Sequence, residues 1–266
     1  MGHSWALKPF EAFGANLQEF SLLHRCAQGG IQQGANVCHL NEVLDKAALV
    51  LGDEPKKRNA KYEAMLEAIA REEVGNGYPR LNSWAVIYLS STLEAFVKEY
   101  LTKWIQRRPS TMKLQAVQKV KIGIADVRLM NNYEIARYIV TSLGSNQAQR
   151  PKSGVDRYEK MLEHFSLSGR VPRNVSKSIY ELMRVRNALA HNNGVIDDQF
   201  IRECPWMNCK RGDTLKVKGE SLDSYVNSIE SYVMLIMWRA VNFFRSGAGD
   251  GDIARIFEEH GERYAI

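Results

Sequence analysis

Apolar side chains recur at helical spacing over residues 84–105, and this stripe constrains the fold more than any other segment. Its members are Leu89, Leu93, Phe96, Val97, Tyr100, Leu101 and Trp104. Steps of three and four residues place them on one face of a helix, where they can pack against other helices. We expect this helix to begin after Ser83, a good capping residue, and to close before Pro109.

The remaining pattern is helical along most of the chain. Comparable spacing predicts helices over residues 41–51, 62–74, 158–165, 175–191 and 221–244, with one or two more between 122 and 143. Residues 1–38 carry a weak pattern, because Gly14, Gly29, Gly30 and Gly34 interrupt any helix there. Alternation of Leu215 and Val217 with lysines predicts a short strand. The sequence therefore predicts an all-α fold with at most one small β-hairpin near residues 200–218.

The chain of 266 residues is long enough for one large domain, or for a compact domain with an added lobe. We divide it into an N-terminal helical extension of unknown role (1–80), a helical domain (81–246), and a C-terminal connection with a short helix (247–266). The connection is glycine-rich but lacks the lysine and hydroxyl residue of a phosphate-binding loop.

Cysteine usage and the absence of leader or spanning segments suggest a cytoplasmic protein. The four cysteines are too sparse for a disulfide scaffold, which favours a reducing compartment. The longest apolar run, residues 232–244, is too short to span a bilayer and contains Arg239, so we expect no membrane role. Cys204 and Cys209 lie close in sequence but have no second ligand pair, so we expect no metal and no cofactor.

The net charge of +6 permits a phosphate-rich partner without requiring one. Acidic residues are absent between Glu99 and Asp126 and again from His164 to Tyr180, while both stretches carry several lysines and arginines. Such stretches can be solvated helix ends and loops, or part of a surface that binds a nucleic-acid backbone. Two such stretches in one chain, the second ending just before the motif described next, favour the backbone-binding surface.

Arg186 falls in the middle of the apolar stripe of the predicted helix 175–191. A charged guanidinium there is costly unless it is paired or reaches an anion, so Arg186 is either a structural ion-pair partner or a functional residue. A second, polar face of this helix consists of Tyr180, Arg184, Asn187 and His191. Because Arg186 and His191 are about 140° apart on an ideal helix, one site using both needs the long reach of Arg186, a distorted helix end, or a second copy of the helix.

The stretch Arg184-Val-Arg186-Asn187-Ala-Leu-Ala-His191-Asn-Asn-Gly194-Val-Ile-Asp197 resembles the second conserved helix of the HEPN superfamily and its exit. The earlier Ser-Ser-Thr-Leu-Glu-Ala-Phe segment, with Ser91 and Glu94, resembles the first conserved helix. The resemblance covers residues 82–244 and implies an HEPN-like helical bundle that dimerises through these helices. Many members are metal-independent endoribonucleases, often in toxin–antitoxin or antiviral systems; others have lost activity and bind RNA or a protein partner.

The resemblance implies a catalytic set of Arg186, Asn187 and His191, supported by Glu94, Ser91, Tyr180 and Asn192. Candidates for contacts with the RNA backbone are Arg184, Lys177, Arg173, Arg107 and Arg108. Histidine suits proton transfer, and arginine offers a planar fork that fits phosphate oxygens. Two alternatives remain open: a His191 that only ends the helix, and a Glu94 that forms an ordinary salt bridge. The expected partners are RNA and a second copy bound through the motif helix, with an antitoxin or defence-system protein as a further candidate.

Overall fold

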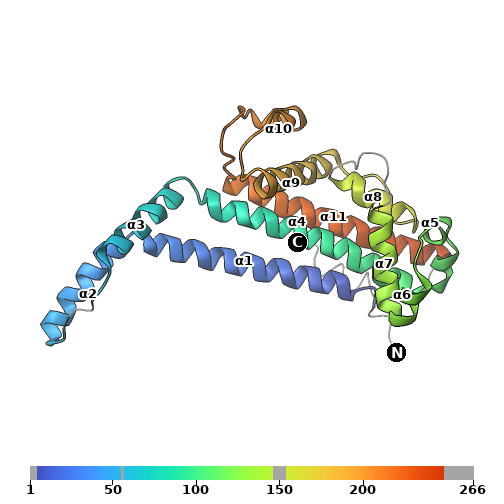
Figure 1. Ribbon diagram of the computed structural model, residues 1–266, viewed down its shortest axis with the longest axis horizontal. Coiled ribbons are helices and arrows are strands. Elements are labelled where there is room, and N and C mark those ends of the chain that lie inside the picture. Colours follow the sequence, from blue (N-terminus) through green and yellow to red (C-terminus); the bar gives the residue numbers. More distant parts are fainter. Residues whose placement is uncertain (1–4, 55–56, 146–153, 249–266) are drawn as a thin grey trace.

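The computed structural model describes residues 5–54, 57–145 and 154–248, and over these residues the fold is all-α, as predicted (Figure 1). The α-helices are α1 (Lys8–Gly34), α2 (Val37–Leu51), α3 (Ala60–Gly75), α4 (Pro79–Arg107), α5 (Gln115–Gln118), α6 (Ile124–Leu129), α7 (Asn132–Ser145), α8 (Val155–Glu163), α9 (Arg173–His191), α10 (Asp198–Glu203) and α11 (Gly219–Phe243). Shorter helical turns are η1 (Pro109–Lys113), η2 (Pro205–Met207) and η3 (Phe244–Ala248). Within the described part, the strand expected at 214–218 is reduced to one bridge between Val195 and Thr214.

Helix α4 is the centre of the bundle and packs against α1, α7, α9 and α11. Its apolar stripe is buried as predicted, and the largest of its side chains, Trp104, is only 1% exposed. Figure 1 shows α1, α4 and α11 running alongside one another, with α9 and α10 above them and α7 crossing at one end. The stripe therefore determines which helices meet, because each of them covers part of α4.

The start of α4 differs from the prediction. Pro79 occupies the first helical turn, and Tyr78 precedes it in the left-handed region at φ 62°. Ser83 lies inside the helix, where its hydroxyl donates to the carbonyl oxygen of Pro79 (2.7 Å). The expected cap at Ser83 is wrong, because proline is well suited to the first turn and the helix starts there.

The expected interruption of residues 1–38 by glycines is also wrong. Helix α1 continues without a break to Gly34, although each interior glycine costs about 1 kcal/mol relative to alanine. Phe13 and Leu17 of α1 are buried in the same core as α4, and such tertiary packing outweighs weak helix propensity. The first half of α1 thus shares the core of the bundle, and the division of the chain at residue 80 stays a prediction.

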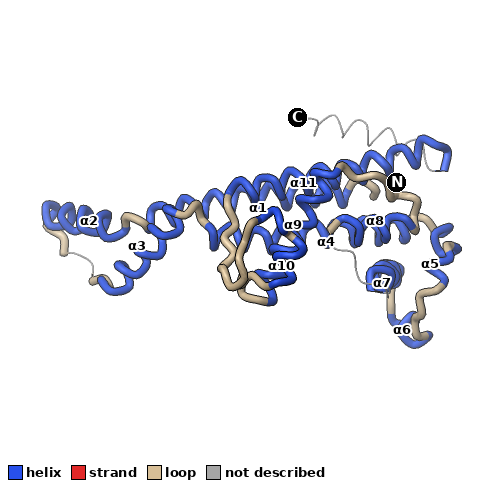
Figure 2. The backbone as a smooth tube through the Cα atoms, turned by 90° about the horizontal axis from the view of Figure 1, so that it is seen from above, coloured by secondary structure: helices blue, strands red, loops and turns tan. Residues whose placement is uncertain are grey.

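Helices α2 and α3 form a helical hairpin that projects beyond the bundle to one side (Figure 2). Two helices, α6 and α7, account for the segment predicted between 122 and 143. Most of the C-terminal connection and the short helix expected after it lie outside the described residues. None of the described helices combines the length and apolar character needed to cross a membrane.

Candidate active site on helix α9

Helix α9 carries the motif and is held rigidly between α4 and α11. Its bounds, Arg173–His191, agree with the prediction of 175–191 to within two residues. Ile179, Leu182 and Val185 are fully buried against the neighbouring helices. Glu181 ties the helix to α11, because its carboxylate accepts a hydrogen bond from the Tyr225 hydroxyl (2.7 Å). The motif residues therefore project from a fixed support.

The helix stays regular through His191. The backbone N–H groups of Asn192 and Gly194 both donate to the carbonyl oxygen of Ala188 (3.0 and 2.9 Å), which closes the helix after the histidine. The Asn192 amide donates to Asp197 (2.9 Å), and Asp197 in turn accepts from the N–H of Phe200 at the start of α10 (2.7 Å). Because the end of the helix is regular, a distortion there cannot bring Arg186 and His191 into one site. The long reach of Arg186 and a second copy of the helix remain.

The guanidinium of Arg186 turns toward Asn187 and donates to its side-chain oxygen (3.2 Å). Arg186 is half-buried, and no carboxylate of the described residues lies within ion-pair distance of it. Two neighbouring hollows flank this contact. One, of about 180 Å³, is lined by Arg186, and the other, of about 250 Å³, is lined by His191. Asn187 and Arg184 line both, so Asn187 lies between the arginine and the histidine.

Glu94 and Ser91 of α4 line the hollow on the Arg186 side. Glu94 forms ion pairs with Lys98 (2.6 Å) and with Arg157 of α8 (3.5 Å). Burial acts to raise the pKa of Glu94, but the hydrogen bond from Lys98 and the charges of Lys98, Arg157 and Arg186 prevail and hold the pKa below its ordinary value. Glu94 is therefore an ionised member of a salt bridge, and Arg186 acts on it only through its charge.

The polar face of α9 is partly covered by the chain itself. Residues 192–218, which we call the α10 lobe, place Glu203 against Arg184 in an ion pair (2.9 Å). Arg184 also lies over the ring of Tyr180, 5.2 Å from its centre. Lys177 lies 4.5 Å from the ring centre of Trp206 in the lobe. Arg184, Tyr180 and Lys177 thus form the contact with the lobe, whereas Asn187 and His191 stay at a hollow open to a ligand.

Three of the candidate backbone contacts lie away from the motif. Arg173 is at the exposed beginning of α9, thirteen residues and about 20 Å along the helix from Arg186. Arg107 and Arg108 lie at the end of α4, again about 20 Å from Glu94 along the helix axis. The guanidinium of Arg108 lies over the rings of Trp104, Phe243 and Phe244. The structure does not bring these arginines together with Arg186 and His191.

Within the described residues, no group of three or more His, Cys, Asp or Glu side chains is arranged to hold a metal ion. Cys204 is buried within the α10 lobe, and burial raises its pKa to about 12. Its thiol therefore stays protonated at neutral pH, whereas metal ligands and nucleophiles need the thiolate.

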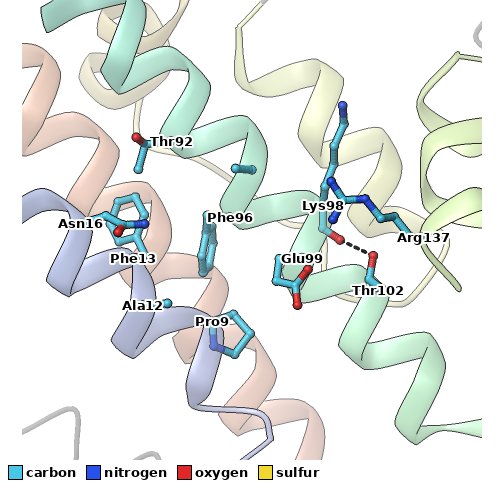
Figure 3. A pocket seen from close by; sticks show the side chains of 11 residues that line it. Pro9, Ala12, Phe13, Asn16, Thr92, Phe96, Lys98, Glu99, Thr102 and Arg137 are labelled. Carbon is cyan, nitrogen blue, oxygen red and sulfur yellow. Dashed lines mark hydrogen bonds between the residues drawn. The ribbon is translucent and has the colours of Figure 1, made fainter. Parts of the chain in front are cut away.

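A further cavity of about 290 Å³ lies between α1, α4 and α7 (Figure 3). Pro9, Phe13 and Phe96 give it apolar walls, and Figure 3 shows Lys98 and Arg137 on its other side. Lys98 thus borders this cavity while it neutralises Glu94. None of the site residues proposed from the sequence lines this cavity.

Sequence reasoning missed several residues that shape the site. Arg157 reaches Glu94 from α8, and no pattern in the sequence relates these two positions. Glu203 was not recognised as the partner of Arg184, since the pairing depends on how the lobe folds back. Asp197 had a readable signal, because an aspartate three residues before Phe200 is a typical helix cap.

Comparison with known proteins gives no further guide to this site. No family model matches the chain, and no match is found among curated proteins or among solved structures. The chemistry of the site is therefore interpreted from its own residues.

Proposed function

We propose that the chain is a metal-independent endoribonuclease of the HEPN type, with Arg186, Asn187 and His191 as its catalytic residues. The observation that carries the proposal is the arrangement around Asn187. It receives a hydrogen bond from a half-buried guanidinium that has no acidic partner in the described structure, and it lines the hollow that contains His191. A cation held in this way is available to an anion, and the phosphate of RNA is an anion with the matching geometry.

The proposed reaction needs one proton acceptor and one stabiliser of negative charge. His191 takes the proton from the 2′-hydroxyl of the RNA, and the 2′-oxygen attacks the neighbouring phosphorus. The bond from phosphorus to the 5′-oxygen breaks, and a proton is returned to that departing oxygen. Arg186 stabilises the charge on the phosphoryl oxygens in the transition state. The products carry a 2′,3′-cyclic phosphate and a 5′-hydroxyl.

His191 is suited to this role by its surroundings. It is exposed at the end of α9, and within the described residues its imidazole has no hydrogen bond or ion pair to another side chain. Both ring nitrogens are therefore available to substrate or solvent. Asn187 lies one turn before it on the same face of the helix, so the two side chains can contact one ligand.

The test is incubation of the purified chain with end-labelled RNA in excess chelator. We expect cleavage with 2′,3′-cyclic phosphate ends, and no cleavage where the 2′-hydroxyl is missing from the substrate. His191→Ala should abolish cleavage, whereas His39→Ala, which removes an exposed histidine on α2, should preserve it. Cleavage that strictly requires magnesium would contradict the proposed mechanism.

The alternative function is a non-catalytic module that binds RNA or a protein partner. It is favoured by the ion pair between Arg184 and Glu203, because this contact gives part of the polar face of α9 a structural role. It is also favoured by the place of His191 at a helix C-terminus, where the dipole stabilises a cation. RNA retained in a gel-shift experiment without any cleavage, in wild type and His191→Ala alike, would support this alternative.

We further propose that a second copy packs against the end of α9, at the hollow that Asn187 and His191 share with residues of the α10 lobe. In a toxin–antitoxin or antiviral setting, a protein antitoxin could occupy the same surface and block it. Asn187→Glu would put two like charges across a two-fold contact, and it should weaken self-association at α9 at least 10-fold in sedimentation equilibrium. No change in the association constant would contradict this arrangement.

A further inference from the structure

The hairpin of α2 and α3, residues 37–75, which we call the arm, has its apolar side chains on the outside. In α2, Leu40, Leu44, Ala47 and Leu51 follow steps of four, three and four residues, the spacing of a helix seam that packs against other helices. All four are exposed, and α2 has no buried residue at all. The seam therefore exists in the sequence but has nothing to pack against.

Polar contacts fix the inner side of α2. Glu67 of α3 accepts a hydrogen bond from the N–H of Cys38 (2.8 Å). Arg58, in the loop before α3, pairs with Asp45 (2.7 Å) and donates to the carbonyl oxygen of Asn41 (3.3 Å). Cys38, Asn41 and Asp45 share one face of α2, and the apolar seam lies on another face of the same helix.

Helix α3 exposes a matching set of apolar side chains. The exposed fractions on the two helices are Leu40 49%, Val43 48%, Leu44 49%, Leu49 64%, Val50 86%, Leu51 78%, Tyr62 58%, Met65 55%, Leu66 38% and Ile69 46%. A soluble monomer does not normally expose a continuous apolar surface of this kind, and such surfaces mark interaction sites.

We propose that the arm binds the arm of a second copy of this chain, so that two hairpins form a four-helix bundle across a two-fold axis. An antiparallel hairpin with an apolar seam on each helix is half of such a bundle, and an identical hairpin supplies the other half. No other helix of the described residues covers the exposed side of the arm, because the arm projects away from the bundle (Figure 1). This inference is independent of the proposed nuclease activity.

The area available approaches that of a small dimer interface. A leucine-sized side chain carries on the order of 100 Å² of apolar surface. Seven large, about half-exposed side chains share one side of the hairpin by helical spacing and offer roughly 350 Å² per copy: Leu40, Leu44, Leu51, Tyr62, Met65, Leu66 and Ile69. Two copies together would bury about 700 Å² of apolar surface, toward the ~1,000 Å² at which specific interfaces begin. The stems of the charged side chains around the seam add to this area.

The charges of the arm favour a protein partner over RNA or an anionic lipid surface. Helix α2 contains two acids and one base, Glu42, Asp45 and Lys46, and α3 contains four acids and two bases. This acidic excess would repel phosphate groups.

Sedimentation equilibrium of the full chain from 0.1 to 50 μM, roughly the range that separates tight from weak dimers, tests the proposal. The variant Leu44→Glu/Leu51→Glu changes two exposed seam positions, so folding should be unaffected and the far-ultraviolet circular dichroism should match wild type. We expect its dissociation constant for self-association to rise at least 100-fold. The matched control is Leu129→Glu, which changes an 87% exposed leucine on α6 and should leave self-association unchanged.

Two results would overturn the proposal. One is a wild-type chain that is monomeric throughout this range. The other is a seam variant that associates as tightly as wild type. RNA cleavage by wild type and the seam variant, measured in parallel, keeps a failed dimer distinct from a failed nuclease.

Discussion

Lys98 donates a hydrogen bond to Glu94 across one turn of α4 (2.6 Å), so the carboxylate that lines the Arg186 hollow is already neutralised by another cation. Arg157 adds a second positive charge on the same carboxylate. Arg186 is therefore not required to balance the charge of Glu94. Substitution of this half-buried arginine can then distinguish a structural role from a role in binding RNA phosphate.

Arg186→Ala is expected to change the free energy of unfolding by no more than about 1 kcal/mol, because no buried carboxylate loses its ion-pair partner. If Arg186 binds RNA phosphate, the same substitution abolishes cleavage. Thermal melts and a cleavage assay on one preparation measure both effects. A loss of about 3–5 kcal/mol, the magnitude of a broken buried pair, would instead identify Arg186 as a structural residue.

His191→Ala should leave the melting temperature unchanged, because the side chain is exposed at the end of α9 and packs against nothing essential. Cleavage should fall by ~10²–10⁴-fold, the range for loss of a proton-transfer group. Initial rates with a short labelled RNA provide the measurement, with His39→Ala as the control. Equal rates in wild type and His191→Ala would exclude this histidine from the chemistry.

Arg239→Ala is expected to destabilise the fold by about 3 kcal/mol. Arg239 is 9% exposed and pairs with Glu159 at 2.8 Å, and the same carboxylate accepts from the Tyr232 hydroxyl. Removing the arginine leaves that acid buried between α8 and α11. Arg211→Ala breaks an exposed pair with Asp198 and should change stability by less than about 0.5 kcal/mol. Urea titrations compare the two, and equal losses would contradict the prediction.

The pH dependence of stability should report on Glu94. Its pKa in the folded chain lies below the ordinary value of 4.5. The ionised carboxylate therefore stabilises the fold fully above pH 4.5, and this contribution is lost as the pH falls through the lowered pKa. The effect should not exceed about 1 kcal/mol, because the side chain is 32% exposed and partly screened.

Glu94→Gln removes this titration. Chemical denaturation at pH values from 6 down to about 3, a range that passes through the ordinary pKa of a glutamate, should show a shallower loss of stability in the variant than in wild type. Glu134→Gln, which changes a glutamate on α7 outside this cluster, serves as the control. Parallel curves for wild type and Glu94→Gln would contradict the prediction.

The spacing of apolar residues predicted the helices that carry strong apolar stripes. Among these are α4 and α9, which lie at the centre of the bundle and carry the candidate site. The prediction failed at the start of α4 and along α1, where a proline in the first turn and packing of Phe13 outweighed the local signals. The hydrogen bond between Arg186 and Asn187 was not predicted, because helical spacing placed Arg186 on the apolar stripe and Asn187 on the polar face with His191.

The partners of the motif could not be predicted in the same way. Arg157 comes from α8 and Glu203 from the α10 lobe, and these contacts depend on how distant segments fold together. The stretches without acidic residues gave no information on distances in space. Arg107 and Arg108 were therefore grouped with the motif, although they lie about 20 Å from Glu94 along α4.

Helix α1 has a mechanical consequence that follows from where its glycines fall. Up to His24, which contacts Asn82 (3.1 Å), the helix lies against α4, and by Gly34 it has reached Ala70 of the arm. Gly29 and Gly30 lie between these contacts, and nothing approaches within 4 Å of the place where their side chains would be. Glycine is the weakest helix former apart from proline, so this turn is the most compliant part of a long rod. A load applied to the arm should therefore bend α1 at Gly29–Gly30. Bending of the arm relative to the bundle should be concentrated in that one turn of the helix.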